Sequence, residues 1–414
     1  MFDSPRYSKA KEKAAIVAAF AFIQACCLTS AQDFTTRDAI SNPFGVNGPL
    51  PFGKPLDLGV GKGFKGGIGV GIGLQSTYDS NFFQTEHDEE SELSTAILPH
   101  LNYSTDSEGG ATVSISAGYQ PAIRNYLQNP DLNGVDQSGN VSIIISGSKT
   151  LISAYAGYTQ ESGTDRLVGE FVTGSALSLG LQGAYQLAPR TSIYANWSTS
   201  ISDYGTSSVV GFDNYSVNLG GTWAATERFR FGPSIGFSTT NSDNTGTQDS
   251  WNFSMNTTYA ANELIRLAAS LGLQFSQNSR ESGSANTNLT GSLSASYKIN
   301  ELWSWSNSIQ SGIIPSPTQT NYVINNWSIS SILNRQLLIG SAGIGVDYYI
   351  SDYERVGTAG ASQGADDNIG ILLSFQRPFF TDRIGFNTSL RYSINSGQNE
   401  WSQLQLNTGL SMEF

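Results

Sequence analysis

Few side chains in this sequence are suited to catalytic or metal chemistry. The chain of 414 residues has two histidines, His87 and His100, and two cysteines, Cys26 and Cys27. His87 lies in the acidic segment EHDEESE, which lacks a spacing typical of metal ligands. A hydrolytic site needs a histidine with a nucleophile and a carboxylate in reach, and no motif in the sequence supplies these partners. We therefore predict no catalytic residues, no cofactor and no metal site, with a hydrolytic role of His100 as the alternative.

The other side chains with chemical capacity are charged residues spread through polar, glycine-rich segments. They are Arg124, Arg230, Arg266, Lys298, Asp347, Arg383 and Arg391. Their charge is mostly positive, and rings of cationic side chains in a pore favour anions. Selecting a solute is therefore the chemistry open to them, provided that the elements carrying them bring them to one passage.

The stretch from Trp401 to Phe414 indicates what those elements are. It reads WSQLQLNTGLSMEF, in which apolar residues largely alternate with polar residues or glycine. Successive residues of a strand point to opposite sides, so this stretch has one apolar and one polar face. A strand of a soluble sandwich can alternate in the same way. The final aromatic residue favours the closing strand of a bacterial outer-membrane barrel, with Leu410, Met412 and Phe414 as its signal to the barrel-assembly machinery.

The composition favours a membrane barrel over a soluble domain. Charged residues make up 14% of the chain, against ~25% in typical soluble domains. Hydrophobic content is 39%, and no segment beyond residue 31 reaches the ~18 apolar residues of a spanning helix. Lipid-facing apolar positions that alternate with small polar lumen positions produce this mixture. The net charge of −12 argues against a nucleic-acid partner.

The first 31 residues predict a signal peptide. Basic residues precede an apolar segment at 14–28, and Ala31 suits the small-residue cleavage rule. A buried core helix and a lipoprotein site at Cys26 are the alternatives. Removal of 1–31 would leave a chain without cysteine, and therefore without disulfides. We expect export through this segment and residence in the outer membrane of a Gram-negative cell, in contact with lipid and lipopolysaccharide.

Residues 32–65 lack alternation and are rich in proline and glycine. We predict an irregular arm on the periplasmic side, which serves as a tether or as a plug of the barrel. Its glycine run, GVGKGFKGG, lacks the spacing of a phosphate-binding loop.

Residues 66–414 alternate throughout and predict an all-β fold, a closed antiparallel transmembrane β-barrel. About eighteen strands fit the pattern, with sixteen or twenty as alternatives. The predicted ranges are 67–78, 93–104, 111–126, 138–148, 150–161, 171–187, 191–204, 212–225, 228–240, 249–261, 264–277, 286–299, 302–313, 319–332, 336–350, 366–376, 382–395 and 401–414. Short links such as LNRQ (333–336) alternate with longer polar links at 80–92, 129–139 and 351–366. Short periplasmic turns and longer extracellular loops are the asymmetry expected of such barrels.

Aromatic residues recur close to the predicted periplasmic turns. They are Tyr185, Trp223, Tyr259, Tyr297, Phe375 and Phe414. The first four follow one another at intervals of 36–38 residues, the length of one hairpin. Amphipathic rings are enriched at the depth of lipid headgroups, so we predict that these residues form a membrane girdle. Cross-strand packing in a soluble sandwich does not explain the regular depth.

Side-chain parity on the predicted strands points the charged residues into the lumen. On 264–277, for example, Ile265 and Leu267 share the lipid face, so Arg266 faces inward. The functional interpretation is a pore that favours anionic or polyhydroxylated solutes. The structural alternative is that these arginines lie at the inner rim, solvated or paired with turn glutamates such as Glu263.

The layout resembles the outer-membrane proteins of the family beta-barrel porin 2, which are often linked to exopolysaccharide or capsule production. The matching features are the first strand, which ends in TYDSNFF (77–83), the repeated aromatic–turn hairpins and the terminal Phe414. The likeness covers about 65–414. It implies an outer-membrane channel, with polysaccharide as a candidate solute, and supplies no catalytic residues.

Two functions are consistent with the sequence. The first is a porin-like channel for passive diffusion or export of polar or anionic solutes, with exopolysaccharide among them. The second is a non-conducting barrel, plugged by the arm at 32–65, with a structural or surface-interaction role. Electrical conductance separates the two.

Overall fold

The structure is a computed structural model that describes residues 56–57, 65–106, 113–165, 170–205, 210–242, 246–278, 286–315, 322–355, 362–379, 383–397 and 400–414. The predicted signal peptide and most of the predicted arm lie outside these residues.

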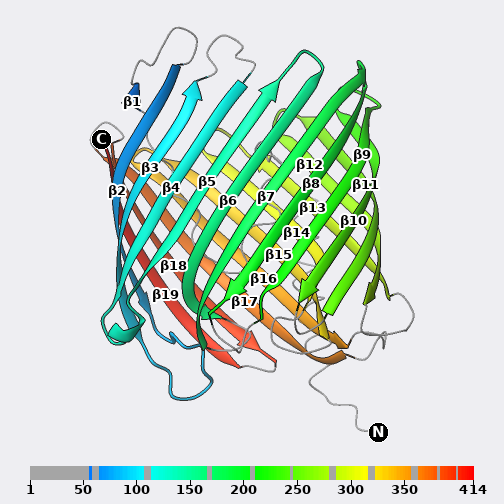
Figure 1. Cartoon of the computed structure of the whole chain (residues 1–414). Coiled ribbons are helices and arrows are strands. Elements are labelled where there is room, and N and C mark those ends of the chain that lie inside the picture. Colours follow the sequence, from blue (N-terminus) through cyan, green and yellow to red (C-terminus); the bar gives the residue numbers. More distant parts are fainter. Residues whose placement is uncertain are drawn as a thin grey trace.

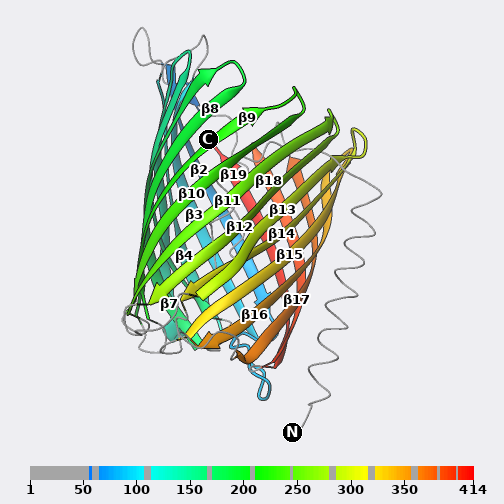
Figure 2. The same cartoon turned by 90° about the vertical axis from the view of Figure 1, so that its right-hand side faces the viewer.

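Eighteen antiparallel strands, β2 to β19, close into one barrel (Figures 1 and 2). Every strand pairs with its neighbours in sequence, and β19 pairs with β2 to complete the cylinder. The predicted fold class and the number of eighteen strands are confirmed. The strands are β1 (Leu56–Asp57), β2 (Lys65–Asp79), β3 (Glu92–Asp106), β4 (Val113–Tyr126), β5 (Gly134–Ser146), β6 (Thr150–Asp165), β7 (Glu170–Ala188), β8 (Thr191–Tyr204), β9 (Phe212–Ala224), β10 (Phe229–Ser242), β11 (Gly246–Asn262), β12 (Ile265–Asn278), β13 (Asn286–Lys298), β14 (Trp303–Pro315), β15 (Tyr322–Leu337), β16 (Gly340–Arg355), β17 (Ser362–Phe379), β18 (Ile384–Ser396) and β19 (Trp401–Glu413).

The two faces of each strand differ in chemistry because alternate residues face the outside and the inside of the closed cylinder. On β12, Leu271 and Leu273 are exposed on the outer face, whereas Ser276 on the inner face is buried. Small hydroxyl side chains line the concave inner wall, where neighbouring strands crowd them. Several join across strands at 2.6–2.7 Å, namely Ser116–Ser142, Ser198–Ser216, Ser234–Ser254 and Ser308–Ser330.

The two ends of the barrel carry different connections. The short-turn end carries tight turns such as Leu338–Ile339, together with the C-terminus and β1. In Figure 1 it is the upper end, and the connection at 80–91 lies at the lower end. We call this lower end the long-loop end. A 3-10 turn, η2 (Pro130–Leu132), belongs to another of its connections.

Several predicted connections are wrong because the strands continue into them. LNRQ (333–336) lies within β15, and the turn follows at Leu338–Ile339. Gly340 allows this turn, because an added Cβ would overlap the carbonyl oxygen of Gln376 on β17. The predicted loop at 351–366 is also largely strand, since β16 extends to Arg355 and β17 begins at Ser362.

The seam of the barrel is reinforced where the chain ends. The ladder between β19 and β2 runs from Gln405↔Asp79 to Glu413↔Gly71, and the amide of Phe414 bonds to the Val70 oxygen at 2.9 Å. Further along β2, the two residues of β1 take over the pairing, with Leu56 opposite Ile68. β1 therefore covers a backbone edge that the end of β19 leaves open.

Within the described ranges, no helix is long and apolar enough to cross a membrane.

Candidate functional site in the barrel lumen

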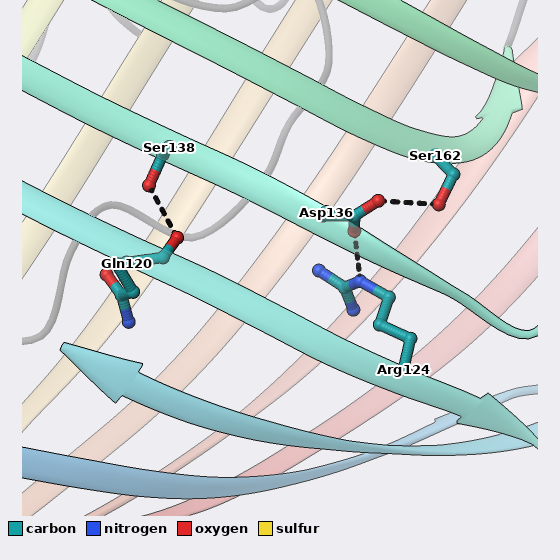
Figure 3. Close-up of polar contacts among 5 residues, drawn as sticks. All are labelled: Gln120, Arg124, Asp136, Ser138 and Ser162. Carbon is teal, nitrogen blue, oxygen red and sulfur yellow. Dashed lines mark hydrogen bonds and ion pairs between the residues drawn. The ribbon is translucent and has the colours of Figure 1, made fainter.

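One ion pair on the inner wall joins three neighbouring strands. Arg124 on β4 donates from Nε to Asp136 Oδ2 on β5, and Ser162 Oγ on β6 donates to Asp136 Oδ1 at 2.6 Å (Figure 3). Ile123 is exposed on the outer face, so its neighbour Arg124 points inward, as predicted from parity. The Arg124 side chain is 17% exposed and Asp136 is 8% exposed. This cation is therefore largely balanced by a buried carboxylate.

Sequence reasoning missed Asp136 because it assigned this residue to a loop at 129–139. The strand β5 begins earlier, at Gly134, and register places Asp136 opposite Ala122, two residues from Arg124. A hydrogen bond across the preceding connection fixes the position at which β5 begins. In it, Asn133 Oδ1 accepts from the Tyr126 amide at 2.7 Å. The polar segment GVDQSG resembled a loop in composition although it pairs as a strand.

A second ion pair joins two predicted lumen residues across an intervening strand. Arg391 Nη2 on β18 lies 2.6 Å from Asp347 Oδ2 on β16. Gly370 on β17 separates them, and a Cβ at that position would lie 2.6 Å from both groups. The missing side chain of Gly370 therefore permits the contact. Arg391 Nε also donates to Ser393 Oγ at 3.0 Å, which fixes the guanidinium against the wall.

The remaining predicted lumen cations lie at the short-turn end. Arg230, Arg266 and Lys298 are exposed and share the inner-face parity of β10, β12 and β13. Within the described part of the chain, Arg230 and Lys298 form no ion pair, with turn glutamates or otherwise. Arg383 precedes β18 in a turn, and its backbone oxygen accepts from the Glu413 amide at 2.9 Å.

His100 lies on the inner face, as predicted from its parity, and it bridges the seam. Its Nε2 lies 2.8 Å from Oε1 of Glu413 on β19. The register places Gly71 of β2 between the two residues. His87 is 83% exposed, and its nearest carboxylate, that of Glu86, is 3.9 Å away. Within the described ranges, no three His, Cys, Asp or Glu side chains gather as a metal site.

Aromatic side chains mark two levels on the outer face. The six predicted girdle residues lie near the short-turn ends of β7, β9, β11, β13, β17 and at the end of β19. Their register partners extend this level, with Trp223 against Phe231 at 5.3 Å and Phe229 against Tyr259 at 6.3 Å between ring centroids. Towards the long loops, Trp251 packs on Phe237 at 4.9 Å.

The spacing of these two levels is close to the ~25 Å apolar band of outer-membrane barrels. Trp251 and Tyr259 are both on β11, and at ~3.3 Å per residue and a tilt of ~40° they are about 20 Å apart along the barrel axis. Cations accompany the short-turn level on the outside, since Arg335 lies 4.9 Å over Trp303 and Arg377 lies 4.4 Å over Phe379. Such pairs suit the boundary between lipid and water.

Aromatic rings also gather at the long-loop end. Phe82, in the connection after β2, lies 5.4 Å from Tyr126 at the end of β4 and 5.8 Å from Phe171 at the start of β7. Tyr126 and Phe171 are themselves 5.6 Å apart. The start of the connection at 80–91 therefore packs across the ends of several strands through Phe82.

Comparisons with known proteins find likenesses at low identity. No protein-family model matches the chain, so the resemblance to beta-barrel porin 2 is not confirmed. No curated protein matches either. The chain is similar to the solved structure of the outer membrane protein opdK from Pseudomonas aeruginosa, with 13% identity over 84% of this chain and 99% of that one, at a TM-score of 0.48.

Two further solved structures show the same degree of likeness. OpdO of Pseudomonas aeruginosa has 12% identity over 84% of this chain and 97% of that one, with a TM-score of 0.47. OccAB3 of Acinetobacter baumannii has 10% identity over 84% and 99%, with a TM-score of 0.48.

Proposed function

We propose that this protein is an outer-membrane channel that lets small polar solutes cross through its lumen, with a preference for anions. The observation that carries the proposal is the closed barrel with a continuous apolar outer face and a polar inner wall. A water-soluble protein rarely exposes so much contiguous apolar surface. A lipid environment removes the free-energy cost of exposing this apolar surface to water. Closure of the barrel gives every strand a hydrogen-bonding partner on both edges where water is absent.

Barrel size supports conduction. Barrels of 16–18 strands leave room for an aqueous passage, whereas eight-stranded barrels are filled by their own side chains. The inner wall here carries serine, threonine, asparagine and glycine, which occupy little volume and offer hydrogen bonds to a hydrated solute. We therefore infer passage of small polar molecules. Exopolysaccharide is a candidate solute on the strength of the sequence resemblance alone.

The distribution of ion pairs supports an anion preference from one end of the lumen. Arg124 and Arg391 are each balanced by an aspartate, so they contribute little net field. Arg230 and Lys298 are exposed cations without ion pairs among the described residues. Unbalanced charges lining a passage through low-dielectric walls attract counter-ions. We infer that the short-turn mouth sets the selectivity.

The location follows the same reasoning. We infer residence in the outer membrane of a Gram-negative cell, export through residues 1–31, and contact with lipid, lipopolysaccharide and the barrel-assembly machinery. The short-turn end would face the periplasm, because short turns lie on that side of such barrels.

Recording in a planar lipid bilayer tests the proposal. The mature chain should give a stable ohmic current, and a salt gradient should produce a reversal potential of the sign for anion preference. A variant lacking residues 32–55, which keeps β1, is the matched control for the plugged alternative. Silence of the full chain and current from the deletion would favour the plug, and silence of both would refute the channel.

A further inference from the structure

An apolar groove of about 420 Å³ lies on the outer face of the barrel, across β3 to β7. Its floor is made by small residues, Ala117, Gly139 and Ala156. The rings of Tyr119 and Tyr158 stand on either side of Gly139, because register makes Gly139 the direct partner of both. The groove exists because Gly139 leaves a gap between the two rings, and Ala117 and Ala156 leave space in the next row, on either side of Val141.

A row of polar residues borders the groove on the side of the long loops. Register aligns Gln137 with Gln160, Gln160 with Ser175, and Ser175 with Asp203, on the outer face of β5 to β8. The rows on the short-turn side are apolar, including Val141 and Leu177. The outer face therefore changes from apolar to polar at one end of the groove.

Two tyrosine hydroxyls donate hydrogen bonds to residues of this polar row. Tyr119 Oη donates to Gln137 Oε1 at 3.1 Å, and Tyr158 Oη donates to Gln160 Oε1 at 3.3 Å. Gln137 Nε2 donates to the same Gln160 oxygen at 3.5 Å. The carboxamide of Gln160 thus accepts twice, and its Nε2 donates to no residue of the described part of the chain. An amide donor next to lipid is costly unless an acceptor reaches it.

We propose that this groove binds lipopolysaccharide, the lipid of the leaflet on the long-loop side, with one acyl chain of its lipid A between Tyr119 and Tyr158 and an ester carbonyl accepting from Gln160 Nε2. An ester-linked lipid supplies both things that the surface lacks, an apolar chain for the floor and an acceptor at the polar row. The proposal rests on the membrane location inferred above and is independent of conduction.

A second copy of this chain fits the groove less well. Stable protein interfaces bury roughly 800 Å² on each partner, whereas this groove has a volume of about 420 Å³ and is bounded by the rings of Tyr119 and Tyr158, which suits a single chain of methylene groups. The adjoining tyrosine hydroxyls turn to Gln137 and Gln160 within the same barrel, rather than projecting towards a partner.

Native mass spectrometry of the full barrel tests the proposal with purified lipid A as probe. Ala156→Leu fills the floor, and Gln160→Leu removes the donors at nearly constant size. Ala195→Leu on β8 is the matched control, because Ala195 is exposed on the outer face outside the groove. Heat-modifiable migration on gels confirms that each variant is a closed barrel.

We expect wild type and Ala195→Leu to retain one lipid A molecule per barrel at a detergent concentration that strips other lipid. Ala156→Leu and Gln160→Leu should each lose at least five-fold in occupancy. Equal occupancy in all four proteins, no retained lipid in wild type, or a dimer that Ala156→Leu disrupts would each overturn the proposal. Because conductance is not measured, failure here would leave the channel proposal standing.

Discussion

His100 Nε2 lies 2.8 Å from Glu413 Oε1, and the contact crosses over Gly71. The three residues belong to β3, β19 and β2, so one side-chain pair joins the first and last parts of the barrel. Gly71 makes this possible, because an added Cβ would overlap the His100 imidazole and lie 2.7 Å from the Met412 carbonyl oxygen. The pair is largely buried, with 3% exposure of the His100 side chain.

Replacing Gly71 by alanine should therefore weaken closure of the barrel. The new methyl group must displace either His100 or the backbone of β19, and overpacking of this kind costs about 1–3 kcal/mol. Urea unfolding of the reconstituted barrel measures the change. Gly312→Ala is the control, since a Cβ there meets nothing within 4 Å. Equal midpoints for the two variants would contradict the proposed role of the seam contact.

Neutralising Arg230 and Lys298 together, each to glutamine, should reduce anion preference. Both are exposed on the inner face at the short-turn end, so their removal takes away unbalanced positive charge. The reversal potential in a salt gradient should move towards zero. Arg335→Gln is the control, because Arg335 lies over Trp303 on the outer face. An equal shift in the control would mean that the lumen cations do not set selectivity.

Asp136→Asn should have the opposite effect on selectivity. It leaves Arg124 without its carboxylate partner and adds net positive charge to the inner wall. Anion preference should rise, and stability should fall by about 3–5 kcal/mol because an uncompensated charge remains partly buried. The double variant with Arg124→Gln should restore both properties towards wild type. Unchanged selectivity in Asp136→Asn would show that this pair does not border the ion path.

Gly370→Ala should separate Arg391 from Asp347. The added methyl would lie 2.6 Å from both groups, so the pair must open. A double-mutant cycle of Arg391→Gln and Asp347→Asn should show coupling in the wild-type background and little coupling in the Gly370→Ala background. Coupling that survives the substitution would mean that the two side chains meet by another route.

Phe82→Ala should release the connection at 80–91. Its ring contacts Tyr126 and Phe171, so truncation removes contacts that hold the connection against the strand ends. Cleavage by a glutamate-specific protease near Glu89 should accelerate several-fold. Phe253→Ala, which removes an outer-face ring packed on Phe275, is the control and should leave cleavage unchanged. Equal rates in the two variants would contradict an anchored connection.

The sequence was sufficient for the strand pattern because alternation repeats on every strand. The strand predicted at 264–277 is β12, Ile265–Asn278, and its parity places Arg266 inside. Local pattern was insufficient where polar segments pair as strands, as at Gly134–Ser146. It was also insufficient at the turn Leu338–Ile339, whose two residues are apolar and whose one favourable residue, Gly340, follows them.

The contacts at the inner wall depend on register between strands, which a single sequence does not reveal. Arg391 and Asp347 were predicted to face inward, yet their meeting requires Gly370 on the strand between them. The His100–Glu413 contact likewise requires β19 to pair with β2, and these two strands are separated by most of the chain. The face on which a side chain lies follows from the order of apolar and polar residues along one strand. The partner that it meets on another strand depends on how the closed barrel pairs its strands.

The claim that a polar lumen conducts inside an apolar cylinder is tested most directly with two adjacent residues of β13. Ser292 and Leu293 are both exposed but face opposite sides of the wall. A membrane-impermeant thiol reagent is added during bilayer recording of two variants lacking residues 1–31, Ser292→Cys and Leu293→Cys. We predict that the current through Ser292→Cys falls on labelling and that Leu293→Cys is unaffected. Block of Leu293→Cys alone, or no current to block in either protein, would contradict a polar conducting lumen inside an apolar cylinder.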